Sequence, residues 1–357
     1  MHEAKQEKYL GDIITTNAKH AATVSTRRAR GFGIISDITQ ILNHIQDSKR
    51  RTRVGLHLRQ AWLINSILLN IEVWHNVLKK DTNIFLNLDH YLMRQITGAH
   101  SKVPVEFLYL ETAAIPIDYI LASRRVNYLH NILSKQDSEL VKRVYIAQKD
   151  ITVKGDWCDM VKMDMELIGL NMTESEIQSM SKNKFKRHVK KCMKTATFSA
   201  LKLMQADHIK IKHIKYKAFK LQPYLQSGLF SQEEASTLFN LRANTVNGFK
   251  ACFPNMHKND IECKLGCTVE DTMAHSFQCK QLGTQSEISY DAIFANETQQ
   301  KQAVIEFINR SCTRSALLAD RASQGHQVLD TSTRATARGA GSIDRGISSL
   351  PVDASCE

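Results

Sequence analysis

The sequence predicts an all-α protein built from several helical parts. Apolar residues recur at three- and four-residue spacing over long stretches, which is the pattern of a helix with one buried face. Alternation of apolar and polar residues with a period of two, which is typical of a half-buried strand, is scarce. Only five prolines and fifteen glycines interrupt the 357 residues, and this leaves room for long helices.

Helical segments are expected to follow one another through the first 133 residues. Residues 33–48 place their isoleucines on one face, whereas residues 56–78 are apolar over more of the circumference and are expected to be central. A third helix is expected over residues 84–96. Pro104 and Pro116 are each expected at the start of a further helix, where a missing backbone N–H costs nothing. Together these segments predict a helical bundle.

The positive charge of the chain is concentrated in one segment. The net charge is +12, from 48 basic and 36 acidic residues. Residues 182–220 hold twelve lysines, one arginine and the single acid Asp207, so they carry 13 − 1 = +12, and the rest of the chain balances. A helix is expected over residues 182–206, and residues 208–220 alternate isoleucine and lysine too irregularly to assign. A localised basic segment favours polyanions, with nucleic acid first and an anionic membrane surface second.

The basic segment is the candidate nucleic-acid interface. Lysines at successive i+4 positions repel one another by roughly 0.2–0.5 kcal/mol per pair, and phosphates lying against them would relieve this. Lysine rather than arginine favours contact with backbone phosphates over reading of bases. The alternatives are a solvated helix face or a surface for acidic proteins. Few aromatic residues interleave: Phe185, Phe198, Tyr216 and Phe219. The candidate contact residues are Lys182, Lys186, Arg187, Lys190, Lys191, Lys194, Lys210, Lys212, Lys215 and Lys217.

A short cysteine–histidine pattern is the candidate metal site. Its spacing is C-x3-C-x7-H-x3-C, formed by Cys263, Cys267, His275 and Cys279. Zinc takes four tetrahedral nitrogen or sulfur ligands, and short loops deliver them in pairs. With all four positions filled by protein, the zinc would be structural rather than catalytic. The alternative is two ordinary buried cysteines with a surface histidine. The nearby residues 252 (cysteine) and 257 (histidine) are possible replacement ligands.

Other features bound the class of protein. The first ten residues are charged and lack the apolar core of a secretory signal. The longest apolar stretch, residues 60–71, is shorter than the roughly 20 residues of a membrane-spanning helix. We interpret the eight cysteines as reduced thiols or metal ligands, which suits an intracellular location, the nucleus included. No Gly-rich phosphate loop and no Asp-Asp dipeptide occurs, so we expect no small-molecule substrate and no catalytic metal pair.

Several stretches resemble LINE-type, non-LTR retrotransposon reverse transcriptases. Lys8–Ile14 (KYLGDII) resembles the segment that closes the palm in that family. Asp271 and Thr272, followed by the histidine and the last cysteine of the metal pattern, resemble its C-terminal knuckle. The segments that resemble the thumb are Leu63–Trp74 (LINSILLNIEVW), Pro104–Glu111 (PVEFLYLE), Ile115–Ile117 (IPI) and Arg124–His130 (RRVNYLH). The likeness runs in the expected order from about Lys5 to Leu282.

The resemblance implies a division of the chain into successive parts. They are residues 1–30 as the end of the palm, 31–150 as a helical thumb-like domain, 151–250 as a basic helical linker, 251–285 as a CCHC zinc knuckle, 286–312 as a short helix, and 313–357 as a tail. The tail composition, poor in large apolar side chains, predicts disorder. In the family these parts hold RNA or an RNA/DNA duplex. The aspartates that catalyse polymerisation have no counterpart here, so the resemblance implies a binding remnant. A non-enzymatic scaffold for acidic partners, or a polymerase completed in trans, are the alternatives.

Overall fold

Helices dominate the fold, as the sequence predicts. In the computed structural model, the described residues are 6–9, 12–15, 20–74, 77, 79–151, 153–246, 262–267, 269–270, 272–283 and 286–336. Among them the strands are limited to one antiparallel hairpin, β1 (Gln6–Tyr9) and β2 (Asp12–Thr15), in which Gln6 pairs with Thr15. The sequence did not predict this hairpin, because four-residue strands are too short to show a period. The all-α prediction is confirmed.

The first half of the chain forms a packed set of helices and short helical turns. In order these are α1 (Ala21–Asn43), α2 (Ser48–Leu58), the π-helix η1 (Arg59–Ile64), α3 (Asn65–Ile67), the 3-10 turn η2 (Ile71–Val73), α4 (Lys79–Thr97), α5 (Val105–Thr112) and α6 (Ile117–Leu133). Pro104 and Pro116 directly precede α5 and α6, as expected. The continuous helix expected over residues 56–78 is instead divided among α2, η1, α3 and η2, and Asn70 has a φ of 56°.

The second half continues with helices of very different length. They are α7 (Leu140–Ile151), α8 (Trp157–Leu167), α9 (Glu174–Ser179), α10 (Lys182–Asp207), η3 (Pro223–Leu225), α11 (Gln232–Arg242), α12 (Met273–Gln278), η6 (Lys280–Leu282), η7 (Tyr290–Phe294) and α13 (Glu297–Thr336). Helices α9 and α11 each begin with a capping box, Thr173 with Glu176 and Ser231 with Glu234. The basic helix ends within one residue of its predicted bound.

Two hydrophobic clusters hold the helices together. The first packs α1, α3, α4 and α5 against α11, and we call these helices the bundle. The second packs α6 against α7, α8, α9 and the first half of α10. Helix α6 contributes to both, with Ile117 in the first and Val126 in the second. Tyr145 and Trp157 lie in the same cluster, on either side of the division predicted at residue 151.

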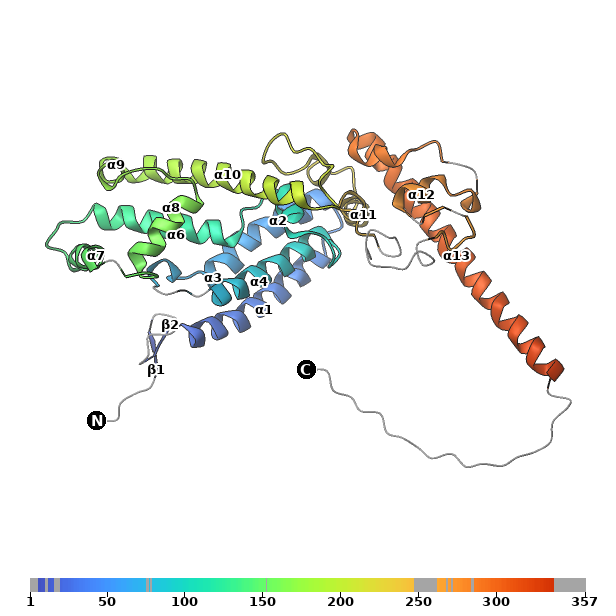
Figure 1. Cartoon of the computed structure of the whole chain (residues 1–357), viewed down its shortest axis with the longest axis horizontal. Helices are drawn as coiled ribbons and strands as arrows, with labels where there is room; N and C mark the ends of the chain where they lie inside the picture. Colours follow the sequence, from blue (N-terminus) through green and yellow to red (C-terminus); the bar gives the residue numbers. More distant parts are fainter. Residues whose placement is uncertain are drawn as a thin grey trace, which may run out of the picture.

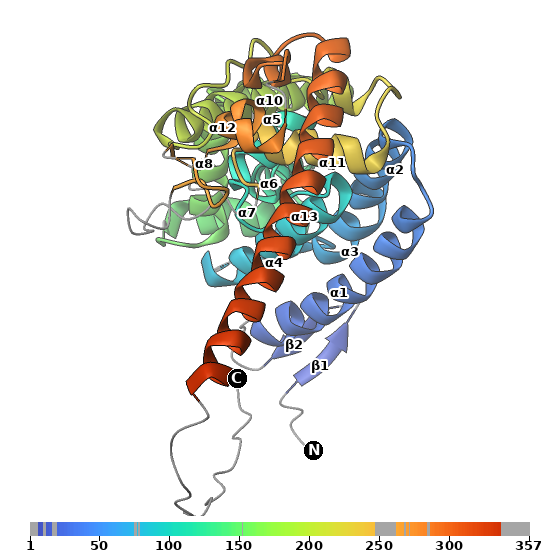
Figure 2. The same ribbon diagram turned by 90° about the vertical axis from the view of Figure 1, so that its right-hand side faces the viewer.

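Helices α10 and α13 lie at the outside of the molecule. Figure 1 shows α10 lying along one edge of the molecule, and α13 projecting away from the other helices at the opposite end from α7. Seen from that end, α13 crosses in front of the bundle (Figure 2). Helix α13 continues to Thr336, well beyond residue 313, where the sequence predicted a disordered tail to begin. No proline occurs between Pro254 and Pro351, so nothing in the sequence stops the helix.

Candidate functional site

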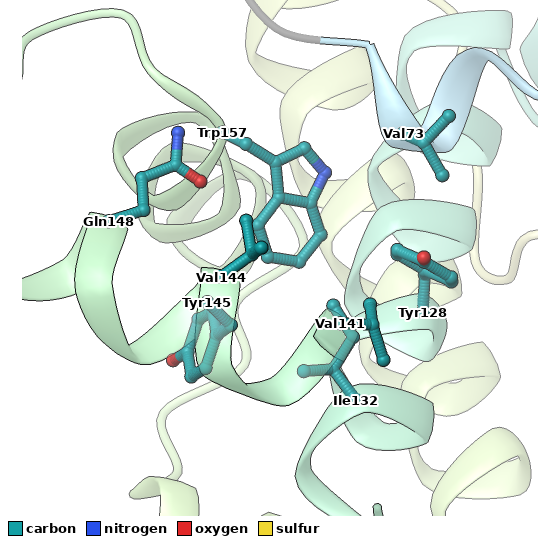
Figure 3. A pocket seen from close by; sticks show the side chains of 8 residues that line it. All are labelled: Val73, Tyr128, Ile132, Val141, Val144, Tyr145, Gln148 and Trp157. Atoms are coloured by element: carbon teal, nitrogen blue, oxygen red, sulfur yellow. The ribbon is translucent and has the colours of Figure 1, made fainter. Parts of the chain in front are cut away.

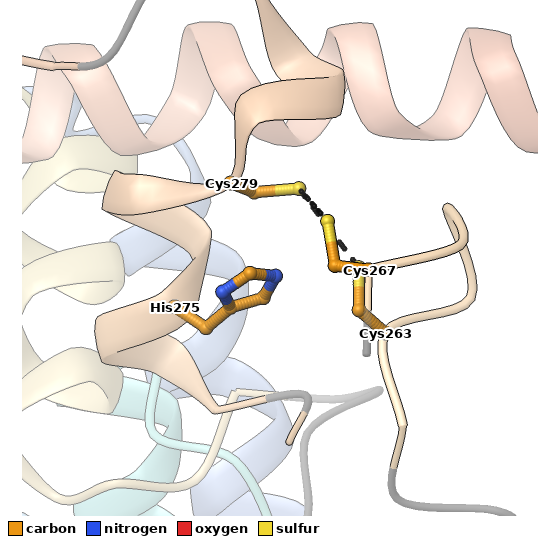
Figure 4. Close-up of side chains that lie close together, drawn as sticks. All are labelled: Cys263, Cys267, His275 and Cys279. Atoms are coloured by element: carbon orange, nitrogen blue, oxygen red, sulfur yellow. Dashed lines mark hydrogen bonds between the residues drawn. The ribbon is translucent and has the colours of Figure 1, made fainter. Parts of the chain in front are cut away.

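The four predicted metal ligands converge on one point. The ligand atoms of Cys263, Cys267, His275 and Cys279 all lie within 4.8 Å of one another (Figure 4). The Sγ of Cys279 lies 3.8 Å from the Sγ of Cys263 and 3.7 Å from that of Cys267. Disulfide sulfurs would be about 2.0 Å apart. Tetrahedral Zn–S bonds of about 2.3 Å place two sulfurs about 3.8 Å apart, so this cluster could hold a metal ion of the size of zinc.

A tight turn delivers the first pair of cysteines. Glu262 and Glu270 form an antiparallel bridge, and the amide of Cys263 donates to the carbonyl of Val269 at 3.0 Å. Between them the amide of Gly266 donates to the carbonyl of Cys263 at 2.9 Å, with a φ of 90° at the glycine. This left-handed backbone is strained for any residue with a Cβ. The glycine therefore lets both thiols point to the same side.

A capped helix delivers the second pair. Thr272 is the N-cap residue of α12. Its hydroxyl accepts a hydrogen bond of 3.0 Å from the amide of His275. His275 and Cys279 are four residues apart, and Cys279 ends the helix in an extended conformation. Side chains one helical turn apart project from the same face. The described residues between 262 and 283 thus form a bridge, a turn and a helix around the ligand atoms, and we call this unit the knuckle.

His275 carries the strongest sign that an ion belongs in the cluster. Its side chain is 8% exposed, and the buried Nε2 has no hydrogen-bond partner. Leaving a buried polar atom unpaired costs about 1–3 kcal/mol. A metal ion bound to Nε2 would remove that cost. The alternative of two buried cysteines with a surface histidine does not fit, because the histidine is buried beside three thiols.

Helix α13 braces the knuckle from outside the ligand set. The guanidinium of Arg310 donates to the carbonyl of Ser276 and to that of Cys279, each at 2.8 Å. Leu265 and Leu282 pack with the cysteines, and Leu318 of α13 covers them. On its other side α12 inserts Phe277 into the first hydrophobic cluster. The knuckle thus uses apolar surface from its neighbours. The possible replacement ligands at residues 252 and 257 lie outside the described residues.

The contact residues that the sequence predicted within α10 are all exposed. They are Lys182, Lys186, Arg187, Lys190, Lys191 and Lys194. In the part of the chain between residues 153 and 246, no ion pair joins them to a carboxylate. Phe185 and Val189 anchor this half of the helix in the second cluster. The outward face of the helix is therefore basic and uncompensated.

The sequence prediction missed one member of this face. Lys184 is exposed and lies three, seven and ten residues before Arg187, Lys191 and Lys194. This helical spacing places the four side chains on one face, directed away from the buried Phe185 and Val189. The predicted row at i+4 drifts around the helix, because four residues exceed one 3.6-residue turn. The positions of the buried residues would have been the better guide.

The segment after α10 is irregular but firmly held. Ile211, Ile214 and Tyr216 are buried in the first cluster, so the alternating lysines point outward. Lys212, Lys215 and Lys217 are exposed, and Lys210 is half-buried. Gln205 holds the turn by donating from Nε2 to the carbonyl of Ile211 at 2.8 Å.

Few of the interleaved aromatic residues are available to stack on a base. Phe185 and Tyr216 are buried. Phe198 and Phe219 are half-buried and pack against each other with ring centroids 5.8 Å apart. The Nζ of Lys202 lies 5.4 Å from the ring centroid of Phe198. This surface is therefore suited to phosphates more than to bases.

A buried carboxylate that the sequence did not single out ties this segment to the bundle. Glu111 accepts hydrogen bonds from the hydroxyls of Tyr216 at 2.5 Å and Tyr224 at 2.6 Å, and from Arg242 at 3.0 Å. Burial and the Glu111 carboxylate hold the pKa of both tyrosines well above the usual value. Burial alone would lower the pKa of Arg242, but the carboxylate raises it. The positive charge of Arg242 thus persists in the folded protein.

Comparisons with known proteins identify no relative. The chain matches no protein-family model, no curated protein and no solved structure. Within the described part of the chain, no helix is long and apolar enough to cross a membrane. Function must therefore be argued from the knuckle and the basic surface.

Proposed function

We propose that this chain is a nucleic-acid-binding, C-terminal part of a LINE-type reverse transcriptase that lacks the catalytic aspartates. The observation that carries the proposal is the exposed, uncompensated basic face of α10. Its backing in the second cluster supports the proposal, since a rigid helix presents its charges in a fixed array. The sequence likeness supports the same conclusion, and RNA or an RNA/DNA duplex is the partner it implies.

The dimensions of the basic helix suit a duplex backbone. Helix α10 has 26 residues and is therefore about 39 Å long. This is comparable to one turn of a duplex, about 34–36 Å. The exposed lysines after the helix extend the charge beyond its end. Binding would then be driven by neutralisation of phosphates and release of counterions, with little preference for sequence.

The knuckle supports the proposal as a structural zinc site. Three thiolates and an imidazole form a soft ligand set that favours zinc over magnesium or calcium. With one ligand from each of the four residues, no position would be left for a substrate water. The zinc would order the knuckle against α13.

Salt dependence of binding tests the proposal. The triple variant Lys186→Ala, Lys190→Ala and Lys194→Ala should flatten the log–log salt slope of duplex binding by roughly two to three units. A matched control removes three exposed lysines elsewhere: Lys79→Ala, Lys80→Ala and Lys154→Ala. It has the same net charge and should keep the slope of the unmodified chain. An equal slope in both variants would contradict the proposal.

A second measurement separates binding from chemistry. No primer extension is expected from the isolated chain with magnesium and nucleotides. Polymerisation needs paired carboxylates that hold two metal ions, and the proposed function does without them. Extension that depends on a residue of this chain would overturn that part of the proposal. Salt-insensitive binding of an acidic polypeptide, without binding of RNA, would favour the scaffold alternative.

A further inference from the structure

Helix α7 exposes an apolar stripe at the end of the molecule opposite to α13 (Figure 1). Leu140 is 75% exposed, Val144 55% and Ile151 70%. They lie at positions i, i+4 and i+11, which share one face of a helix, and the exposed Ala147 at i+7 falls between them. Large side chains gathered in this way on one face mark a site of interaction, whereas scattered ones do not. This stripe is not used by the proposed function.

The stripe is rigidly backed. Tyr145 is buried on the opposite side of α7, donates to Glu174 at 2.7 Å and meets the ring of Trp157 edge-on at 6.1 Å. The pKa of Tyr145 is raised by burial and by this carboxylate, so its hydroxyl remains a donor. Val144, near the middle of the stripe, therefore belongs to a helix that is packed on its opposite side.

A groove of mixed polarity runs beside the stripe. It has a volume of about 210 Å³ and lies between α7, α6 and the turn η2 (Figure 3). Val144 borders both the stripe and the groove, and Val73, Ile132 and Trp157 also line the groove. A side chain from another helix lying on α7 could enter this groove. Stripe and groove together form one docking surface.

The charges beside the stripe indicate what lies on it. Arg143 and Asp150 are exposed, seven residues apart, and on the same side of the stripe. Neither forms an ion pair within the described residues. Seven residues correspond to about 10.5 Å along the helix. One cation and one anion at this spacing match neither a polyanion nor an anionic membrane, which call for basic residues alone.

They do match a second α7 that runs in the opposite direction. A two-fold axis near the middle of α7 brings Arg143 of one copy against Asp150 of the other, and the reverse pair forms as well. Packing of the two stripes sets Leu140 against the second copy's Ile151, and Val144 against its Ala147. This register differs by two residues, about 3 Å, from the one that sets Arg143 level with Asp150, and the long arginine side chain spans that offset. Self-complementarity of this kind is the requirement of a two-fold interface. We propose that α7 mediates a homodimer, in which the two copies of α7 pack antiparallel.

The expected dimer is weak. A contact limited to one twelve-residue helix and its groove belongs to the small interfaces, below roughly 1,200 Å², that are typical of transient association. Dimerisation should therefore appear in the micromolar range. Sedimentation velocity of the full chain over this range, after nuclease treatment and at moderate salt, measures it without bridging by nucleic acid.

Charge reversal tests the geometry. Arg143→Asp and Asp150→Arg each place like charges opposite one another, so each variant alone should dimerise at least about tenfold more weakly, about 1.4 kcal/mol. The double variant restores both pairs and should dimerise like the unmodified chain. A mixture of the two single variants should form a heterodimer, since all its facing charges are opposite. This mixing experiment also shows that both single variants are folded.

The remaining outcomes are decisive in either direction. Val144→Asp should abolish the dimer, whereas Leu203→Asp, at a residue of α10 that is also highly exposed, should leave it intact. A chain that stays monomeric throughout, or single variants that dimerise like the unmodified chain, would overturn the proposal. Loss of dimer in the single variants with no recovery on mixing would overturn the antiparallel arrangement. Binding of duplex by α10 is measured separately and is expected to be unchanged.

Discussion

The knuckle and the bundle both bury polar side chains, but they satisfy them differently. In the bundle, Glu111 is completely buried and finds all its partners within the protein, in Tyr216, Tyr224 and Arg242. In the knuckle, the imidazole of His275 is buried with an unpaired Nε2 beside three thiols. The buried carboxylate of Glu111 is thus satisfied by protein side chains alone. The buried Nε2 of His275 would find a partner in an ion held by the cluster.

The difference follows from the amount of apolar surface each part can bury. The first cluster gathers side chains from many helices, whereas the knuckle's own cluster consists of two leucines with the cysteines. A unit of this size commonly needs a metal or a disulfide to fold. Stability of the bundle should therefore be independent of zinc, and order in the knuckle should not.

Zinc removal is expected to have the largest effect. We expect one zinc ion per chain. Substitution of Cys279→Ser, or addition of a strong chelator, should abolish this zinc binding. Such binding contributes on the order of 10 kcal/mol to the folding of zinc-finger peptides. Amide hydrogen exchange should accelerate in residues 272–283 and stay slow in α4. Cys312→Ser, at an exposed cysteine outside the cluster, is the control. Slow exchange in the knuckle without zinc would show that both parts are held by packing alone.

The buried carboxylate is the corresponding weak point of the bundle. Glu111→Ala leaves the guanidinium of Arg242 buried without its partner, which should lower the free energy of unfolding by about 3–5 kcal/mol. Urea denaturation measures this loss, and zinc content should stay unchanged. Glu139→Ala removes an exposed pair with Lys135 and should change the free energy of unfolding far less than Glu111→Ala does. Equal effects of the two substitutions would mean that the network contributes little.

Local patterns in the sequence predicted what depends on neighbours along the chain. The bounds of α10 could be predicted because its apolar residues have a helical spacing. The metal ligands could be predicted because their spacing is local. Residues that meet only in the folded protein leave no such local pattern in the sequence. Glu111 lies at the end of an apolar run, and its partners are more than one hundred residues away.

The segment 56–78 shows the same limit. The burial expected for it is found at Leu63, Ile67 and Trp74 but not at Trp62, Leu69 and Val73, and the π-helix in its middle was not predicted. Arg59 lies at the start of η1 and donates two hydrogen bonds to Asp89 of α4, at 2.5 and 2.6 Å. A partner thirty residues away thus accompanies the change in helix type. The helical part of residues 313–336 was missed for another reason, since composition alone does not register the helix propensity of its alanines and leucines.

Arg310 of α13 contributes to the knuckle through hydrogen bonds, next to the proposed metal ligands. Its two hydrogen bonds hold the carbonyls of Ser276 and Cys279, next to the ligands but not among them. Groups in this position commonly change metal affinity by about 10–100-fold when they are removed. Arg310→Ala should therefore weaken zinc binding by that factor, measured by competition with a chelator. Arg310→Lys keeps the charge but not the two-pronged geometry, and should recover only part of the affinity. Unchanged affinity in both variants would limit the role of α13 to packing.

The smallest expected effect gives the sharpest comparison, because the same substitution can be made in both parts. Ser231 caps α11 in the bundle, with a hydrogen bond of 3.2 Å from the amide of Glu234, and Thr272 caps α12 in the knuckle. Replacing a capping hydroxyl by alanine costs about 1 kcal/mol. In Ser231→Ala this loss should appear in urea denaturation and leave zinc affinity unchanged. In Thr272→Ala it should instead lower zinc affinity about fivefold, because ordering of the knuckle is coupled to the ion. If both variants change urea denaturation equally and neither changes zinc affinity, the knuckle folds as part of the bundle, and the distinction between the two parts is wrong.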